Sequence, residues 1–78
     1  MRMIDKVETS KMIAKIIEKS GLKQAEIAEK CGMSVENFNA YCTGRRFPSL
    51  DTLFMIADAL GYKVDDMLIV KEVDYGQK

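Results

Sequence analysis

Apolar residues recur along the chain at the three- and four-residue spacing of an amphipathic helix, in blocks that glycine and proline separate. One block spans residues 10–20 and is followed by Gly21, at a position where helices commonly end in a left-handed turn. A broader block spans residues 50–60, with Pro48 ahead of it and Gly61 after it. The pattern therefore predicts a helix in each block.

The stretch from residue 24 to residue 41 is the most constrained part of the sequence and predicts two short helices joined by a tight turn. Ala28 is small where two helices that cross at about 90–120° bring their backbones together. Gly32 follows the first helix, where a positive φ is unstrained only for glycine. Ser34 offers an N-cap hydroxyl to the second helix. The apolar residues expected to bury this unit are Ile27, Cys31, Met33, Phe38 and Tyr41.

An ordinary helical hairpin in a small bundle would produce the same apolar spacing. It would not explain why Ala28 and Gly32 occur together with a polar outer face on the second helix. That combination is typical of a helix-turn-helix, whose second helix presents its polar face outward.

The remaining segments complete an all-α domain of five helices. The second and third helices are expected over residues 24–31 and 35–42, followed by a loop from Gly44 to Pro48. Ser49 is a suitable N-cap for the fourth helix. A short fifth helix is expected over residues 64–69, with acidic side chains favourably placed in its first turn.

The two ends of the chain are less determined than its middle. Residues 1–9 form either an arm or the start of the first helix, because a capping box at Asp5 and Glu8 and a later start near residue 10 both fit. The domain is expected to span residues 10–70, and residues 71–78 to form a polar tail.

Seventy-eight residues make one domain with a small core, so a dimer would add stability. The apolar residues expected at a homodimer interface are Met67, Leu68 and Ile69, and Val70 and Val73 could pair as a strand in the same dimer. No strand is predicted elsewhere in the chain.

The cellular setting is expected to be the cytoplasm. No apolar run approaches the ~20 residues that span a membrane, and the N-terminus, with Asp5 and Glu8 inside it, does not resemble a signal peptide. Cys31 and Cys42 fall at expected core positions and form no CxxC motif. They are interpreted as reduced packing residues, and a redox-sensing pair is the alternative.

The 12 basic and 12 acidic side chains cancel, but they are unevenly distributed. The net charge is +3 over residues 1–23, −2 over 24–43, +2 over 44–50 and −3 over 51–78. A surface that binds a polyanion would therefore combine the N-terminal segment with the loop that holds Arg45 and Arg46. Lys11, Lys15 and Lys19 form a stripe that is either a solvated face or a set of phosphate contacts.

The sequence gives almost no support for catalysis. It contains no histidine, which excludes His-based acid–base and nucleophilic schemes, and it has no glycine-rich phosphate cradle. Asp65 and Asp66 are adjacent and are not spaced as metal ligands. We expect no enzymatic activity, cofactor or metal site. With no effector domain attached, we also expect no small-molecule ligand.

Two stretches carry a family resemblance: G-L-K-Q-A-E-I-A-E-K-C-G-M-S and G-R-R-F-P-S-L-D-T-L-F-M-I-A-D-A-L-G. Over roughly residues 10–70 the chain resembles the Cro and lambda-type phage repressor family of helix-turn-helix proteins, which includes xenobiotic-response-element-like bacterial regulators. The resemblance implies a five-helix lambda-repressor-like fold with the helix-turn-helix at helices two and three. It also implies sequence-specific binding of double-stranded DNA, commonly as a homodimer, and control of transcription.

The resemblance also implies which residues meet DNA. Base readout would come from Gln24, Val35, Glu36, Asn37, Asn39 and Ala40. Phosphate contacts would come from Lys23, Thr43, Arg45 and Arg46. By their chemistry, Val35 suits a thymine methyl group, Asn37 or Asn39 suits adenine, and Glu36 suits either a cytosine amino group or simply the helix dipole.

This sequence departs from the family pattern at two places. Members often carry an arginine and a glutamate that form an ion pair where this chain has Ile17 and Cys42. Both partners are apolar here, so the exchange is compensated and the expected fold stands. The third helix also has no arginine, lysine or glutamine on its groove face, so the strongest guanine contact is absent from it.

Two other functional classes fit the same features. An antitoxin-like module that binds mainly protein would suit a weak groove face and a zero net charge, although the segment after residue 70 is short for wrapping a partner. The small controller protein of a restriction–modification system is a subtype of the regulator interpretation, with similar size and architecture.

Overall fold

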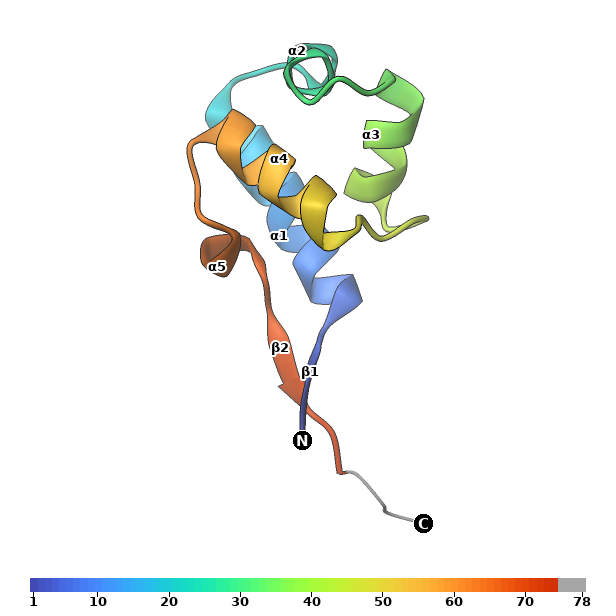
Figure 1. Ribbon diagram of the computed structural model, residues 1–78, viewed down its shortest axis with the longest axis vertical. Helices are drawn as coiled ribbons and strands as arrows, with labels where there is room; N and C mark the ends of the chain where they lie inside the picture. Colours follow the sequence, from blue (N-terminus) through green and yellow to red (C-terminus); the bar gives the residue numbers. More distant parts are fainter. Residues whose placement is uncertain (75–78) are drawn as a thin grey trace.

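The computed structural model describes residues 1–74 and confirms an all-α domain of five helices, with a minor two-stranded sheet (Figure 1). The helices are α1 (Lys6–Ser20), α2 (Gln24–Lys30), α3 (Val35–Thr43), α4 (Leu50–Leu60) and α5 (Val64–Met67). The strands are β1 (Arg2–Ile4) and β2 (Val70–Glu72). Residues 75–78 of the expected tail lie outside the described part of the chain.

The helices begin and end at capping residues that the sequence supplies. The Ser34 and Ser49 hydroxyls accept hydrogen bonds from backbone N–H groups three residues on, at 3.1 and 3.2 Å, which confirms both predicted N-caps. Gly32 has a φ of 68° in the turn between α2 and α3, as this left-handed position requires. α1 begins directly after Asp5, whose carboxylate accepts from the Glu8 N–H at 3.0 Å. The earlier of the two possible starts is therefore the observed one.

The core draws at least one fully buried side chain from every helix. α1 packs against α3 and α5, while α4 packs against α2 and α5. The largest fully buried apolar side chains are Ile13, Ile27, Phe38, Leu53, Ile56 and Met67. Burial of one such side chain stabilises the folded state by about 1.5–3 kcal/mol. Each helix is therefore stabilised against the body by at least one buried apolar side chain.

Met67 was expected at a dimer interface, but the structure places it in the core of its own chain. Its side chain is 0% exposed and fills the core of its own chain, so it is not available to a second copy. The reason is that α5 is a single turn packed on both α1 and α4, which turns its apolar side inward. Leu68 and Ile69 are half-buried, and Leu68 packs against the same core.

Two short segments far apart in the sequence pair in a two-stranded ribbon, so the strand that contains Val70 pairs within its own chain, where pairing across a dimer was the expected possibility. β1 and β2 pair antiparallel, with Arg2 opposite Glu72 and Ile4 opposite Val70. The buried Thr9 hydroxyl fastens the base of the ribbon, since it donates to the Ile69 carbonyl at 3.3 Å and accepts from its N–H at 3.0 Å. Figure 1 shows the ribbon extending from the helical body. With the ribbon included, the molecule measures 45 × 21 × 20 Å.

Ile17 and Cys42 are expected to touch, because α1 packs on α3 and both side chains belong to or pack against the core cluster. Cys42→Glu should lower the free energy of unfolding by about 1–3 kcal/mol, since it places an unpaired acid near the core. Adding Ile17→Arg should recover part of this loss. Thermal melts of the two single variants and the double variant measure the coupling, and strictly additive effects would show that the side chains do not meet.

Burial raises the pKa of the Cys42 thiol from a usual value of 9.0 to about 11. The unfolded chain therefore loses this proton at lower pH than the folded chain does. The stabilisation linked to the protonated thiol is complete below pH 9 and is lost as pH rises towards 11. Between pH 8 and pH 10.5, the melting temperature of the wild type should fall further than that of Cys42→Ala. Equal falls would contradict a buried thiol at this position.

Candidate nucleic-acid interface

The outer face of α3 is polar and open to solvent. Val35 is 43% exposed, and Glu36 and Asn37 beside it are also exposed, while Phe38 is fully buried under the face where α3 packs against α1 and α2. Because Phe38 fixes which side of α3 faces inward, the first turn of the helix is left free to approach a partner. The structure thus brings three of the sequence-predicted base-reading residues together.

Ala40 does not belong to that face. Its side chain is only 5% exposed, so the predicted role for Ala40 in base readout is corrected. The chain turns back after α3 through Gly44, and the Arg46 N–H donates to the Ala40 carbonyl at 3.2 Å. This return of the loop onto the helix was not visible in the apolar spacing.

The Asn39 amide joins three elements. Its Nδ2 donates to Oε1 of Gln24, the first residue of α2, at 3.2 Å. Its Oδ1 accepts from Nη2 of Arg45, in the loop after α3, at 3.5 Å. Both ends of this half-buried amide are therefore engaged in the free protein, and they link α2, α3 and the loop at the surface.

Arg46 lies along α3 and does not extend freely from the loop. Its Nη1 donates to Oδ1 of Asn37 at 3.4 Å, and its guanidinium carbon is 5.9 Å from the centroid of the Tyr41 ring. The arginine is therefore placed next to a side chain predicted to read bases. Apolar spacing and residue type do not indicate this contact, because it depends on the path of the loop.

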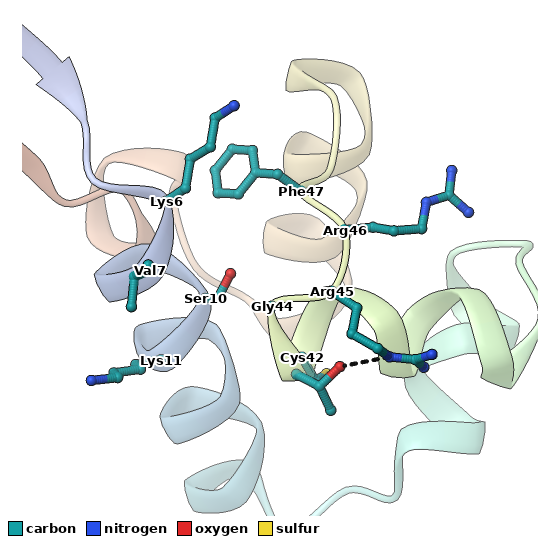
Figure 2. A pocket seen from close by; sticks show the side chains of 10 residues that line it. Lys6, Val7, Ser10, Lys11, Cys42, Gly44, Arg45, Arg46 and Phe47 are labelled. Atoms are coloured by element: carbon teal, nitrogen blue, oxygen red, sulfur yellow. Dashed lines mark hydrogen bonds between the residues drawn. The ribbon is translucent and has the colours of Figure 1, made fainter.

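Thr43 orients Arg45, the other arginine of the loop. Its hydroxyl donates to the Asn39 carbonyl at 3.0 Å within α3, and it accepts from Arg45 Nε at 3.4 Å, the contact drawn as a dashed line in Figure 2. Figure 2 also shows the Arg45 and Arg46 guanidinium groups extending away from α1. The hydroxyl is therefore occupied on both sides, which leaves the arginine as the group best placed to meet an anion.

Lys23 stands at the other edge of the interface, directly before α2. Its side chain is exposed, and its backbone N–H donates to the Glu26 carboxylate at 2.9 Å. This predicted phosphate contact is therefore the neighbour of Gln24, which accepts a hydrogen bond from Asn39 of α3.

A cavity next to the interface was missed by the sequence analysis. It has a volume of about 440 Å³ and lies between the first turns of α1 and the loop after α3 (Figure 2). Four of its lining side chains are basic and none is acidic: Lys6, Lys11, Arg45 and Arg46. The only sequence signal for it was the positive charge of the N-terminal segment, which did not show that Lys6 would lie beside the loop.

Among residues 1–74, no three His, Cys, Asp or Glu side chains are grouped so that they could hold a metal ion. No helix within these residues is long and apolar enough to cross a membrane.

Two short helices, a glycine turn between them and an exposed polar face on the second define a helix-turn-helix DNA-binding domain. A sequence model of the helix-turn-helix family HTH_3, of Cro/C1 type, matches residues 13–67, and the chain belongs to this family. It is accordingly a DNA-binding regulator of transcription.

A solved structure has a similar fold. It is the restriction-modification controller protein C.AhdI from Aeromonas hydrophila, with a TM-score of 0.76 at 22% sequence identity, covering 81% of this chain and 96% of that one. At this identity the similarity concerns the fold alone. No curated protein matches the chain in sequence.

Proposed function

We propose that the chain recognises a specific double-stranded DNA operator, and that it does so as a homodimer on a near-palindromic site. The observation that carries the first part is the placement of Arg45 and Arg46 against the amides of Asn39 and Asn37. Cationic groups suited to phosphate thereby flank polar groups suited to base edges on one exposed surface.

The same contacts suggest how the interface engages DNA. Each arginine–amide hydrogen bond is 3.4–3.5 Å long and exposed, so it is weak and easily exchanged. A phosphate attracts the guanidinium more strongly than a neutral amide does, because both partners are then charged. On binding, the arginines turn to the backbone and leave the Asn37 amide free to read a base.

Val35 and Glu36 complete the proposed readout. Val35 is exposed in the first turn of α3 and offers an apolar contact to a thymine methyl group. Glu36 lies beside it and either accepts from a cytosine amino group or serves the helix dipole. Selection of bound sequences from a random duplex library is the experiment that tests operator recognition, and recovery of no preferred sequence would contradict it.

The dimer is proposed to form through the exposed apolar side chains of α4, in place of Met67. Leu50, Phe54 and Met55 are 59%, 52% and 43% exposed, and Leu50 and Phe54 are four residues apart on one side of the helix. Apolar side chains gathered on one element of a small chain are typical of an interaction surface. Two-fold symmetry would then set the operator half-sites about one turn, ~34–36 Å, apart.

Arg45→Ala and Arg46→Ala should weaken binding to all duplexes alike. Each arginine that neutralises a phosphate contributes about −0.9 to the slope of log affinity against log salt, so each variant should flatten that slope by roughly 1. Lys71→Ala, on the ribbon, removes an equal charge from another face and serves as the control. An unchanged slope combined with an altered sequence preference would mean that the arginines read bases.

Asn37→Ala should behave differently from the arginine variants. It should cost about 1–3 kcal/mol on the preferred operator, relax the preference at one base pair and leave the salt slope nearly unchanged. Affinities for the operator and for its single-base variants, measured over a range of salt concentrations, make the comparison. Equal losses on every duplex would show that Asn37 contacts only the backbone.

Phe54→Asp should abolish the dimer without unfolding the chain, because the side chain is exposed in the monomer while a dimer would bury the new charge unpaired. Sedimentation at micromolar concentration, on and off DNA, measures the state of the wild type and of the variant. Lys63→Ala is the control at another exposed position. A wild type that is monomeric under both conditions would contradict the proposal.

A further inference from the structure

The cavity between α1 and the loop after α3 is strongly basic. Lys6 and Lys11 of α1 and Arg45 and Arg46 of the loop line it, and Figure 2 shows the Lys11 ammonium and both guanidinium groups directed outward from the space between α1 and the loop. The nearest carboxylates do not cancel this charge, because Asp5 caps the helix and Glu8 forms only an exposed pair with Lys11 at 3.5 Å. Exposed pairs of this kind contribute little, so the cavity keeps its attraction for an anion.

Ser10 adds a hydroxyl to the wall of the cavity. Its side chain is only 5% exposed and lines the cavity, and a Cβ added at Gly44 would lie 3.9 Å from its oxygen. Within the described residues its hydroxyl makes no hydrogen bond, whereas the hydroxyl of the neighbouring Thr9 makes two. Figure 2 shows the hydroxyl directed into the space between α1 and the loop. Because no fully buried side-chain oxygen of the described residues lacks a partner, the Ser10 oxygen is accessible from the cavity, and its hydroxyl can donate to an anion there.

Phe47 gives the cavity an apolar wall. Its ring is half-buried, and the Lys6 ammonium lies 5.7 Å from the ring centroid, which holds the lysine at the mouth of the cavity. At about 440 Å³ the space exceeds a single phosphate and accommodates a phosphate with the sugar attached to it.

We propose that this cavity binds a backbone phosphate of the DNA and its deoxyribose, beyond the groove that α3 enters. The inference rests on the proposed function. The two arginines that line the cavity also contact Asn37 and Asn39, so the cavity and the groove face are continuous. Phosphates follow one another every ~3.4 Å of axis along a strand, so a strand held by the arginines brings a further phosphate to Lys6, Lys11 and Ser10.

The salt dependence of DNA affinity tests the proposal in the full chain. The double variant Lys6→Ala/Lys11→Ala should flatten the slope of log affinity against log salt by about 0.9, the contribution of one phosphate. The double variant Lys63→Ala/Lys71→Ala removes the same charge elsewhere and should leave the slope unchanged. Melting curves establish that each variant is folded, which is expected because all four lysines are exposed.

Neutral methylphosphonate linkages, placed one at a time along the operator strand, locate the contact. One position should weaken the wild type and have no further effect on the Lys6→Ala/Lys11→Ala variant. Ser10→Ala should also lose affinity, with sequence preference unchanged. If Arg45→Ala flattens the slope while the lysine variant does not, the cavity proposal is wrong and operator binding stands. If the wild type binds no duplex, the proposed function fails as well.

A small phosphorylated compound is the other source of the same chemistry. Titration of the wild type with inorganic phosphate and with a nucleoside monophosphate should show no saturable binding at millimolar concentration. Saturable binding that the lysine variant loses, together with an unchanged DNA salt slope, would assign the cavity to a free phosphate and overturn the DNA contact.

Discussion

Burial of the Phe38 side chain is the constraint on which the interface depends. Phe38 is fully buried in α3, and its burial requires α2 to cross close to α3. That crossing is possible because Ala28 is small and buried and because Gly32 takes the left-handed turn between the two helices. Once Phe38 is inside, the first turn of α3 has to face solvent. The polar face is therefore a consequence of packing, and its chemistry is set by the few side chains that remain outside.

The contacts on that face are numerous but individually weak. Asn37 and Asn39 each accept a hydrogen bond from an arginine, and Asn39 also donates to Gln24. The two arginine bonds are long and exposed, so their net contribution to stability is small, since the same groups can bond to solvent. They are enough to hold the side chains near one geometry in the free protein. They are also weak enough for a phosphate to replace them, which a buried network of the same groups would not allow.

Caps and turns could be predicted from neighbouring residues, whereas the pairing of segments far apart in the sequence could not. The caps at Ser34 and Ser49 and the turn at Gly32 depend on neighbouring residues, so the sequence specifies them almost completely. The ribbon depends on pairing Arg2–Ile4 with Val70–Glu72, across nearly the whole chain, in strands of three exposed residues that carry no hydrophobic alternation against a core. Periodicity has no means of detecting such a pairing.

Two residues of the candidate site also could not be placed from the sequence. Hydrophobicity marked Met67 as an interface residue and its position in the family pattern marked Ala40 as a groove residue, yet both are buried within the chain. Neither property states which surface covers a residue. For Met67 the cover is the body that α5 packs against, and for Ala40 it is the returning loop. The arginine–asparagine contacts likewise follow from the path of the loop, which Gly44 sets and the residue types alone do not.

The zero net charge of the chain does not weaken the case for a polyanionic partner. At physiological ionic strength, exposed charges more than about 8 Å apart are largely screened from each other. Lys6, Lys11, Arg45 and Arg46 gather around one cavity, while six of the twelve acidic residues lie beyond residue 50. A bound phosphate therefore interacts with the charge of this local cluster and not with the net charge of the whole chain. The same screening makes the attraction short-ranged, so the approach of a duplex should be guided by these four side chains and should weaken steeply as salt is added.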